Sequence, residues 1–174
     1  LRRQRQMCIR DRLCSEYGFY MIAEADLESH GVGTLYTNDG HDCMGYIAQD
    51  DAWAESILDR QKRNVIRDKN QSAVIFWSLG NESGYGGNFE DAGRWVKAYD
   101  PTRLLHYEAS ICNSAGYHND VSMLDVMSRM YADTEWVKEY CEDRRMRKPF
   151  IQCEFIHAMG NGPGDIHCLL YTSP

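Results

Sequence analysis

The sequence predicts an α/β fold: a parallel sheet covered by helices, forming part of an eight-stranded (β/α)8 barrel with about five of the eight strands present. Three observations predict it. Short apolar runs alternate with amphipathic segments of helical length, polar residues follow the apolar runs, and no Gly-x-Gly-x-x-Gly turn follows any run. Such alternation is typical of a parallel sheet with helices packed on it. The missing turn argues against a dinucleotide site.

Five segments are predicted strands because they are short, apolar and followed by polar residues. They cover residues 19–23, 73–79, 104–107, 124–130 and 149–153. Segment 73–79 is the clearest, since it reads Ala-Val-Ile-Phe-Trp-Ser-Leu without interruption by a charge. A complete barrel takes about 250 residues. Five strands in 174 residues are therefore expected to form part of a barrel.

Three segments between these strands are predicted helices, at residues 51–68, 88–99 and 134–143. In the first, Asp50 or Asp51 can serve as N-cap, and Trp53 and Ile66 are expected near the buried face with Ile57 and Val65. Asp100-Pro101 is expected to end the second helix, because proline cannot continue it. Thr134 is the expected cap of the third. The other tryptophans, Trp77, Trp95 and Trp136, are also expected in the core.

Composition and charge exclude several classes of function. The formal net charge of −7 argues against a nucleic-acid partner, since phosphate binding requires clustered Lys and Arg. No stretch is apolar enough to span a membrane, and the basic run at residues 2–12 lacks the apolar core of a signal peptide. The seven cysteines are odd in number and show no Cys-x-x-Cys pair. Reduced thiols in a cytoplasmic protein are therefore expected.

Polar residues gather where the predicted strands end. Glu24, Glu28 and His30 follow the first strand, Asn81 and Glu82 the second, Glu108 the third, Tyr131 the fourth, and Glu154 and His157 the fifth. In a parallel barrel all strands end at the same face, and the chemistry of barrel enzymes lies there. This placement favours a barrel over an open doubly wound sheet, and it predicts one shared site.

Glu82 and Glu154 stand out because each follows an otherwise apolar strand. A carboxylate is costly to bury unless it is paired or bound to a metal. Either acid alone could belong to a structural salt bridge. Together on different strands they predict a pair of carboxylates facing one cavity, as glycoside hydrolysis requires. A separation of about 5–5.5 Å gives retention of configuration and a wider gap gives inversion, so the residues alone leave both outcomes open.

Two further features have both a structural and a functional interpretation. Glu28 and His30 are two apart and can point to the same side of an extended chain, which suits a metal half-site, although a helix cap or a salt bridge is the more common explanation. Tyr131 ends a strand beside polar residues and can hydrogen-bond a nucleophilic carboxylate or a sugar hydroxyl. The histidines at positions 41, 106, 118 and 167 have no such setting and are expected at the surface or in structural roles.

Four segments in order resemble glycoside hydrolase family 2, and within it the large bacterial β-galactosidases. They are Tyr-Gly-Phe-Tyr at 17–20, Glu-Ala-Asp-Leu-Glu-Ser-His-Gly at 24–31, Trp-Ser-Leu-Gly-Asn-Glu-Ser-Gly at 77–84, and Cys-Glu-Phe-Ile-His-Ala-Met-Gly-Asn at 153–161. Several long motifs in register are more specific than any single one. The resemblance implies that the chain is part of a TIM barrel catalytic domain.

By matched position, the resemblance implies a role for each residue of these motifs. Glu82 matches the general acid/base and Glu154 the nucleophile. Asn81, Tyr131 and His157 match residues that contact the sugar or the nucleophile. Glu28, His30 and Glu82 match the protein ligands of a magnesium ion. A monovalent cation is a further possibility that the resemblance raises, with no ligand assigned in this chain.

The activity that the resemblance implies is hydrolysis of terminal β-D-galactose from β-galactosides such as lactose, by retaining double displacement and in a homo-oligomeric parent enzyme. Two alternatives stay open. One is another family 2 activity, β-glucuronidase or β-mannosidase, although the Asn-x-Lys motif of β-glucuronidases is absent. The other is an inactive remnant that binds sugar or metal weakly.

The two ends of the chain do not resemble the family. Residues 1–12 and 167–174 change abruptly in character without linker composition. We interpret them as non-native tails, which leaves residues 13–166 as the partial barrel domain.

Overall fold

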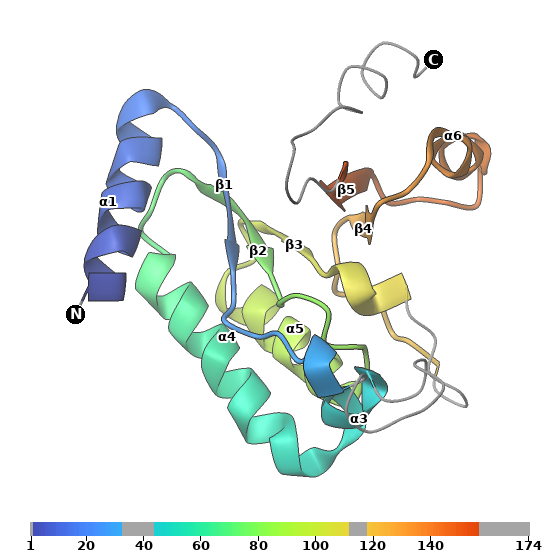
Figure 1. The fold of residues 1–174 in the computed structure, drawn as a ribbon, viewed down its shortest axis with the longest axis horizontal. Coiled ribbons are helices and arrows are strands. Elements are labelled where there is room, and N and C mark those ends of the chain that lie inside the picture. The colour runs from blue at the N-terminus through green and yellow to red at the C-terminus, as the bar shows by residue number, and fades with distance from the viewer. Residues whose placement is uncertain (1, 33–43, 112–117, 157–174) are drawn as a thin grey trace.

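The computed structural model describes residues 2–32, 44–111 and 118–156 (Figure 1). The described strands are β1 (Met21–Glu24), β2 (Val74–Ser78), β3 (Leu104–His106), β4 (Met127–Met130) and β5 (Phe150–Glu154). The described helices are α1 (Arg2–Tyr17), α3 (Met44–Gln49), α4 (Ala54–Asp68), α5 (Gly87–Tyr99) and α6 (Thr134–Glu142), with 3-10 turns η1 (Asp51–Trp53) and η2 (Glu108–Ile111). All five predicted strands and all three predicted helices are present.

Within each sheet the strands follow one another in chain order, and each described pair of neighbours is parallel. Strands β1, β2 and β3 form one sheet and β4 and β5 a second. The second sheet lies against β3, because the Asp125 N–H donates to the Leu105 carbonyl at 2.9 Å and His106 Nδ1 lies 3.1 Å from Ser128 Oγ. A doubly wound sheet would reverse its order at a switch point. The described strands therefore form an open segment of a barrel wall.

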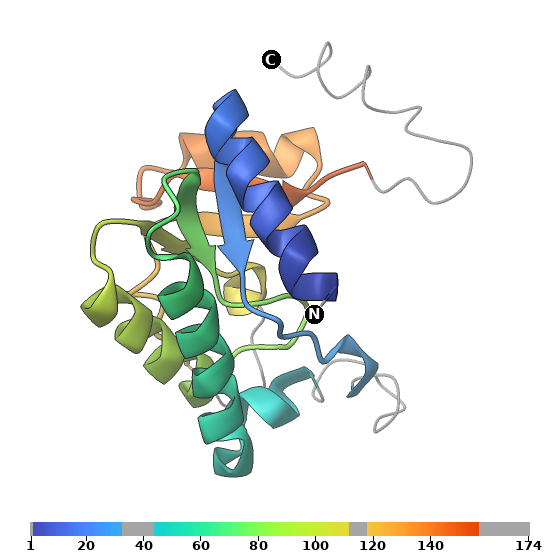
Figure 2. The same ribbon diagram turned by 90° about the vertical axis from the view of Figure 1, so that its left-hand side faces the viewer.

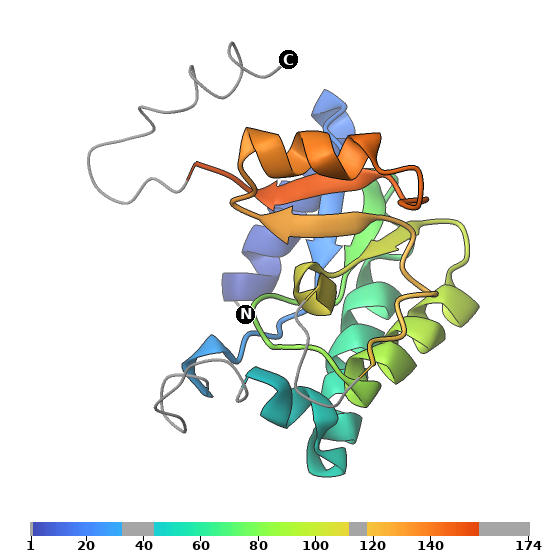
Figure 3. The same ribbon diagram turned by 90° about the vertical axis from the view of Figure 1, so that its right-hand side faces the viewer.

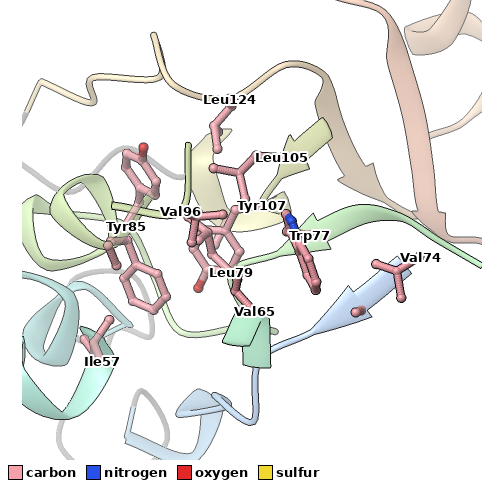
Figure 4. Packing of buried hydrophobic residues seen from close by; sticks show 14 of the residues in the cluster. Ile57, Val65, Val74, Trp77, Leu79, Tyr85, Val96, Leu105, Tyr107 and Leu124 are labelled. Carbon is pink, nitrogen blue, oxygen red and sulfur yellow. The ribbon is translucent and has the colours of Figure 1, made fainter. Parts of the chain in front are cut away.

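Helices α4 and α5 cover one face of the three-stranded sheet, as Figure 2 shows. The row Ala23, Trp77 and Leu105 is in register across the three strands and is buried with Val65 and Val96 of the two helices (Figure 4). Each fully buried side chain of this size contributes about 1.5–3 kcal/mol to folding. This packing fixes the helix-covered face of the sheet.

The opposite face carries the next row of side chains, because residues alternate along a strand. Glu24, Ser78 and His106 are in register there, and Ser78 Oγ donates to Glu24 Oε2 at 2.8 Å. In the row before them, Ile22 and Leu104 are 41% and 42% exposed. This face corresponds to the interior of a barrel, and the described residues cover it only in part.

Helix α6 packs on β4 and β5 (Figure 3). The guanidinium of Arg129 lies 4.5 Å from the ring centre of Trp136, and the Phe150 and Trp136 rings are 5.2 Å apart. Arg129 and Phe150 therefore point toward the helix. Ser128, one residue before Arg129, points the other way, to His106.

Three details of the predicted helices were wrong. Trp53 and Ile66 were expected near the buried face but are 43% and 49% exposed. Ile66 lies nine residues after the buried Ile57, which is half a turn away at 3.6 residues per turn, and Trp53 lies in η1, before α4 begins. The cap of α6 is Asp133, which accepts from the Trp136 N–H at 2.8 Å, in place of Thr134. Asp50 does cap η1, and Asp100 ends α5.

Helices α1 and α3 and turn η2 were not predicted. Helix α1 runs through the predicted boundary between residues 12 and 13, and the position of that boundary stays a prediction. Its end explains why β1 starts later than expected: Gly18 has a φ of +76°, and the Phe19 N–H donates to the Cys14 carbonyl at 2.8 Å. Phe19 and Tyr20 are therefore part of the turn and are exposed.

Three further predictions concern membrane helices, thiols and tryptophans among the described residues. None of their helices has the length and apolar character needed to cross a membrane. Cys14, Cys141 and Cys153 carry free thiols. Trp77 is fully buried, as predicted, whereas Trp95 and Trp136 are half-buried.

Candidate active site

The predicted site residues that the structure describes lie at the carboxyl ends of the strands. Glu24 ends β1, Asn81 and Glu82 follow β2, Glu108 follows β3, Tyr131 follows β4, and Glu154 ends β5. Parallel strands carry these ends to one edge of the sheet. His157 lies outside the described residues.

The turn after β2 places Glu82 through unusual backbone angles. Gly80 has a φ of +147°, and a Cβ at this position would lie 2.8 Å from the Leu27 carbonyl oxygen, so the turn requires glycine. The Asn81 N–H donates to the same carbonyl at 2.8 Å. Glu82 then adopts a φ of +42°, a region that costs a non-glycine residue about 1–2 kcal/mol.

The segment after β1 holds this turn from one side. Glu28 forms an isolated parallel bridge with Asn81. The Ser29 N–H donates to Ser83 Oγ at 2.8 Å, and the same hydroxyl donates to the Asn81 carbonyl at 2.8 Å. Residues 27–30 and 80–83 therefore form one hydrogen-bonded unit across the ends of β1 and β2.

Two of the three predicted metal ligands are in direct contact. His30 Nδ1 lies 3.1 Å from Glu82 Oε2, and both side chains are partly exposed. Glu28 is beside them in the chain, but across residues 2–32, 44–111 and 118–156 no three His, Cys, Asp or Glu side chains are grouped closely enough to hold a metal ion. The contact fits a salt bridge and fits part of a metal site.

A β-bulge directs Glu154 to the face opposite α6. Arg129 is in register with Gln152, and the next residue, Met130, is in register with Glu154, so Cys153 is one extra residue in β5. If residues 152–154 formed a regular strand, Glu154 would share the helix-facing side with Gln152, because side chains alternate. With the bulge, Glu154 lies on the side of Met130 and Ser128, where His106 and Glu24 also lie.

Tyr131 contacts Glu154 in two ways. Its hydroxyl donates to Glu154 Oε2, and its backbone N–H donates to the Glu154 carbonyl at 2.8 Å. The hydrogen bond to Glu154 raises the pKa of Tyr131 to about 12, and the negative charge of Glu82 acts in the same direction. Tyr131 therefore keeps its proton at neutral pH and remains a donor to Glu154.

The carboxylates at this edge act on one another. Burial and the charges of Glu82, Glu24 and Glu154 together raise the pKa of Glu108 to about 7, against the hydrogen bond from the Glu82 N–H, which lowers it. Burial and the charges of Glu154 and Glu28 raise the pKa of Glu24, while the Ser78 hydroxyl lowers it. Since Glu82 and Glu154 both act on Glu108 and on Tyr131, they share one neighbourhood.

Glu108 has no role predicted from the sequence beyond its position after the third strand. The side chain is 9% exposed, and its Oε1 accepts the Glu82 N–H at 2.7 Å. The residue before it, Tyr107, accepts the Ser83 N–H at 3.1 Å through its hydroxyl oxygen. The recurrence of an acid at or just after the ends of β1, β2, β3 and β5 was the signal that could have assigned Glu108 to the site.

Two cavities lie near this edge without containing the carboxylate pair. One of about 1000 Å³ runs along the free edge of β1 and α4, lined by Ala25, Arg63 and Arg67 among others. A smaller one of about 430 Å³ is lined by Glu28, Ser29 and Ser83. We therefore locate the candidate site by Glu82 and Glu154 at the strand ends, and not by either cavity.

Residues 9–171 match the family model of the glycosyl hydrolases family 2 TIM barrel domain. The chain therefore belongs to glycosyl hydrolase family 2, and the described strands are part of its TIM barrel. This confirms the predicted family and fold class. The boundaries of the predicted tails stay a prediction.

Among its relatives are β-galactosidases. Those of Actinobacillus pleuropneumoniae and Staphylococcus xylosus are 46% and 42% identical over 88% and 89% of this chain, which spans 17% and 16% of their own lengths. A β-D-glucuronidase structure from Dictyoglomus thermophilum superimposes with a TM-score of 0.53 at 21% identity, over 89% of this chain and 29% of that one. At that identity the likeness concerns the fold.

Proposed function

We propose that the protein to which this chain belongs is a retaining β-galactosidase that releases terminal β-D-galactose from β-galactosides such as lactose. The observation that carries the proposal is the placement of Glu82 and Glu154 at the ends of β2 and β5, where both act on Glu108 and Tyr131. A facing carboxylate pair is the requirement for glycoside hydrolysis. The β-galactosidase relatives support galactose as the sugar.

Glu154 is the proposed nucleophile. The Tyr131 hydroxyl donates to its Oε2, which orients the carboxylate and leaves Oε1 as the oxygen that we assign to attack on the anomeric carbon. The bond to the departing oxygen breaks as the bond from Oε1 forms, giving a covalent galactosyl-enzyme. Tyr131 keeps its proton through the step because the pKa of its hydroxyl is raised to about 12.

Glu82 is the proposed general acid and base. In the first step it gives its proton to the departing oxygen, and in the second it takes a proton from the water that attacks the anomeric carbon. Galactose leaves with its configuration retained, because the anomeric carbon is displaced twice. We assign Asn81 and His157 to contacts with the sugar, from their matched positions.

We also propose that Glu28, His30 and Glu82 hold a magnesium ion. The contact between His30 and Glu82 and the bridge between Glu28 and Asn81 support the location, and Glu28 has to join the other two when the ion binds. Carboxylate oxygens suit Mg²⁺, whereas histidine is an unusual ligand for it. A cation bound there would favour the ionised form of Glu82. We name no ligands in this chain for a monovalent cation.

We also propose a cellular setting and an assembly state for the parent protein. The free thiols of Cys14, Cys141 and Cys153 support a reducing, cytoplasmic location. A homo-oligomeric parent enzyme is proposed from the resemblance to large bacterial β-galactosidases. The formal net charge of −7 supports a partner other than nucleic acid.

A segment exchange tests the activity. Residues 13–166 replace the matching segment of the Actinobacillus pleuropneumoniae β-galactosidase, giving what we call the grafted enzyme. We expect hydrolysis of lactose, with β-galactose detected by NMR as the first product before mutarotation. Release of α-galactose, or hydrolysis of a β-glucuronide in preference to lactose, would exclude the proposal.

The 174-residue chain on its own is expected to be nearly inactive and to aggregate. The exposed Ile22 and Leu104 on the face opposite the helices and the free edge of β1 invite association. Light scattering and lactose hydrolysis by the purified chain test this expectation. A monomeric, fully active preparation would contradict it.

A further inference from the structure

Two neighbouring residues after β3 accept two successive backbone N–H groups after β2. Glu108 Oε1 accepts the Glu82 N–H at 2.7 Å, and Tyr107 Oη accepts the Ser83 N–H at 3.1 Å. Both acceptors are buried side chains that are 9% exposed or less. Side chains that satisfy backbone groups at a turn are commonly close in the sequence, whereas these two acceptors lie 26 and 24 residues away and tie the turn to the segment after β3.

The backbone at Glu82, whose N–H is one of these two groups, has an energetically unfavourable conformation. Glu82 has a φ of +42°, which a non-glycine residue adopts only when its surroundings determine it. From the other side, Leu27 holds Asn81, and Ser29 contacts Ser83 through a hydrogen bond. The Glu82 N–H lies between these contacts, and Glu108 is its acceptor.

An ionised carboxylate is energetically unfavourable at position 108, because the side chain is buried among other acids. Glu108 is buried near Glu24, Glu82 and Glu154, all of the same charge. Within the described part of the chain it forms no ion pair with a lysine or arginine. What it gains is a hydrogen bond from an N–H at 2.7 Å, and such a bond is stronger when the carboxyl group is ionised.

We propose that Glu108 is a positioning residue for Glu82. By accepting the Glu82 N–H it fixes the left-handed backbone at that residue, and the backbone in turn sets where the Glu82 carboxyl lies relative to Glu154. Tyr107 is the second anchor of the same turn. The inference rests on the role proposed for Glu82, and it adds Glu108, the first residue of η2 after β3, to a site otherwise assigned to residues at the ends of β1, β2, β4 and β5.

The test compares Glu108→Ala with Glu108→Gln in the grafted enzyme. The Ala variant loses the acceptor, so we expect kcat to fall about 100-fold, as for a misplaced group, with KM changed by less than about 3-fold. Hydrogen exchange of the Glu82 amide should become at least about 10-fold faster. Glutamine has a side chain of the same length as glutamate and keeps an oxygen acceptor. The Gln variant should therefore have a kcat within about 5-fold of the unsubstituted grafted enzyme and slow exchange of the Glu82 amide.

Asp100→Ala is the matched control, because Asp100 is also a buried acid that accepts several hydrogen bonds, at the opposite end of the sheet. It should lower stability and leave kcat per folded molecule unchanged. If Glu108→Ala behaves like this control, or if Glu108→Gln is as impaired as Glu108→Ala, the proposal is wrong. If the unsubstituted grafted enzyme is inactive, the proposed function fails, and the Glu82 exchange rate still decides whether Glu108 holds that backbone.

Discussion

The pKa values of buried acids are shifted in opposite directions at the two ends of the three-stranded sheet. Near the amino ends, burial acts to raise the pKa of Asp100, but hydrogen bonds from Thr102, Arg103 and Trp77 outweigh it and lower the pKa to about 2. At the carboxyl ends, burial and like charges raise the pKa of Glu108 to about 7. One acid has cationic and neutral donors, and the other has mainly acids for neighbours.

The difference separates stability from function within one sheet. Arg103 contacts Asp100 at 2.6 Å and also donates to the carbonyls of Val74, Lys69 and Gln71, so the amino end is a fully paired network. The carboxyl end accepts unfavourable charge–charge contacts that folding alone does not require. Clustered shifts of this second kind are characteristic of functional sites. Substitutions at the two ends should therefore have different consequences.

The largest effect is expected for Glu154→Gln at the carboxyl end. Removal of the proposed nucleophile should lower kcat of the grafted enzyme by about 10⁴-fold or more. Because one charge of the acidic group is lost, stability should stay the same or rise. Steady-state kinetics and thermal unfolding of the same preparation measure both. Near-normal turnover would remove Glu154 from the proposed role.

Tyr131→Phe should have the next largest effect on activity. The variant loses the hydroxyl that donates to Glu154 Oε2 and keeps the ring. We expect kcat to fall by about 10- to 100-fold, with a smaller change in KM. Tyr99→Phe is the control, since Tyr99 lies at the end of α5, and it should change neither constant. Equal effects of the two variants would contradict the assignment.

Acid should weaken the amino end through Asp100. Its pKa in the folded state, about 2, lies below its ordinary value of 3.8, so the stabilisation is fully present above about pH 4 and is lost as the pH falls toward 2. The loss amounts to about 2 kcal/mol. Hydrogen exchange of β2 amides in the grafted enzyme between pH 5 and 3 measures its onset. Asp100→Asn should be less stable at pH 6 and show a weaker dependence on pH.

The smallest effect is expected for Glu24→Gln. The substitution removes a charge that repels Glu154 and Glu28 and retains an acceptor for the Ser78 hydroxyl. Because part of Glu24 remains accessible to water, its charge is screened, and the gain in stability at neutral pH should not exceed about 0.5 kcal/mol. Thermal unfolding at pH 7 and at pH 4 tests the sign. A loss of stability at pH 7 would mean that Glu24 is paired in a way that its contacts do not indicate.

The strands and the acids that follow them could be predicted because local sequence determines them. Segment 73–79 is apolar and flanked by turn residues, so β2 and the position of Glu82 follow from pattern alone. The pairing of Tyr131 with Glu154 was anticipated in kind, since a tyrosine at a strand end has few partners except the acids nearby. Motif resemblance then supplied roles that spacing could not.

Other features depend on contacts that no local pattern encodes. Ile66 looked buried because it is apolar and adjacent to Val65, yet helix geometry turns it outward. The acceptor role of Glu108 depends on a turn 26 residues earlier in the chain. The left-handed φ of Glu82 is imposed from both β1 and β3, and a glutamate by itself does not favour it.

The bulge at Cys153 has a consequence for how β5 tolerates change. Gln152 faces α6, and two residues later in a regular strand Glu154 would face α6 as well, so the bulge is what holds the carboxylate on the other side. The thiol itself makes no assigned contribution to the chemistry. The conformation of the bulge therefore matters more than the side chain at its centre: many residues could stand at position 153, whereas a regular strand through residues 152–154 would turn an intact glutamate toward α6 and abolish activity without removing any proposed catalytic group.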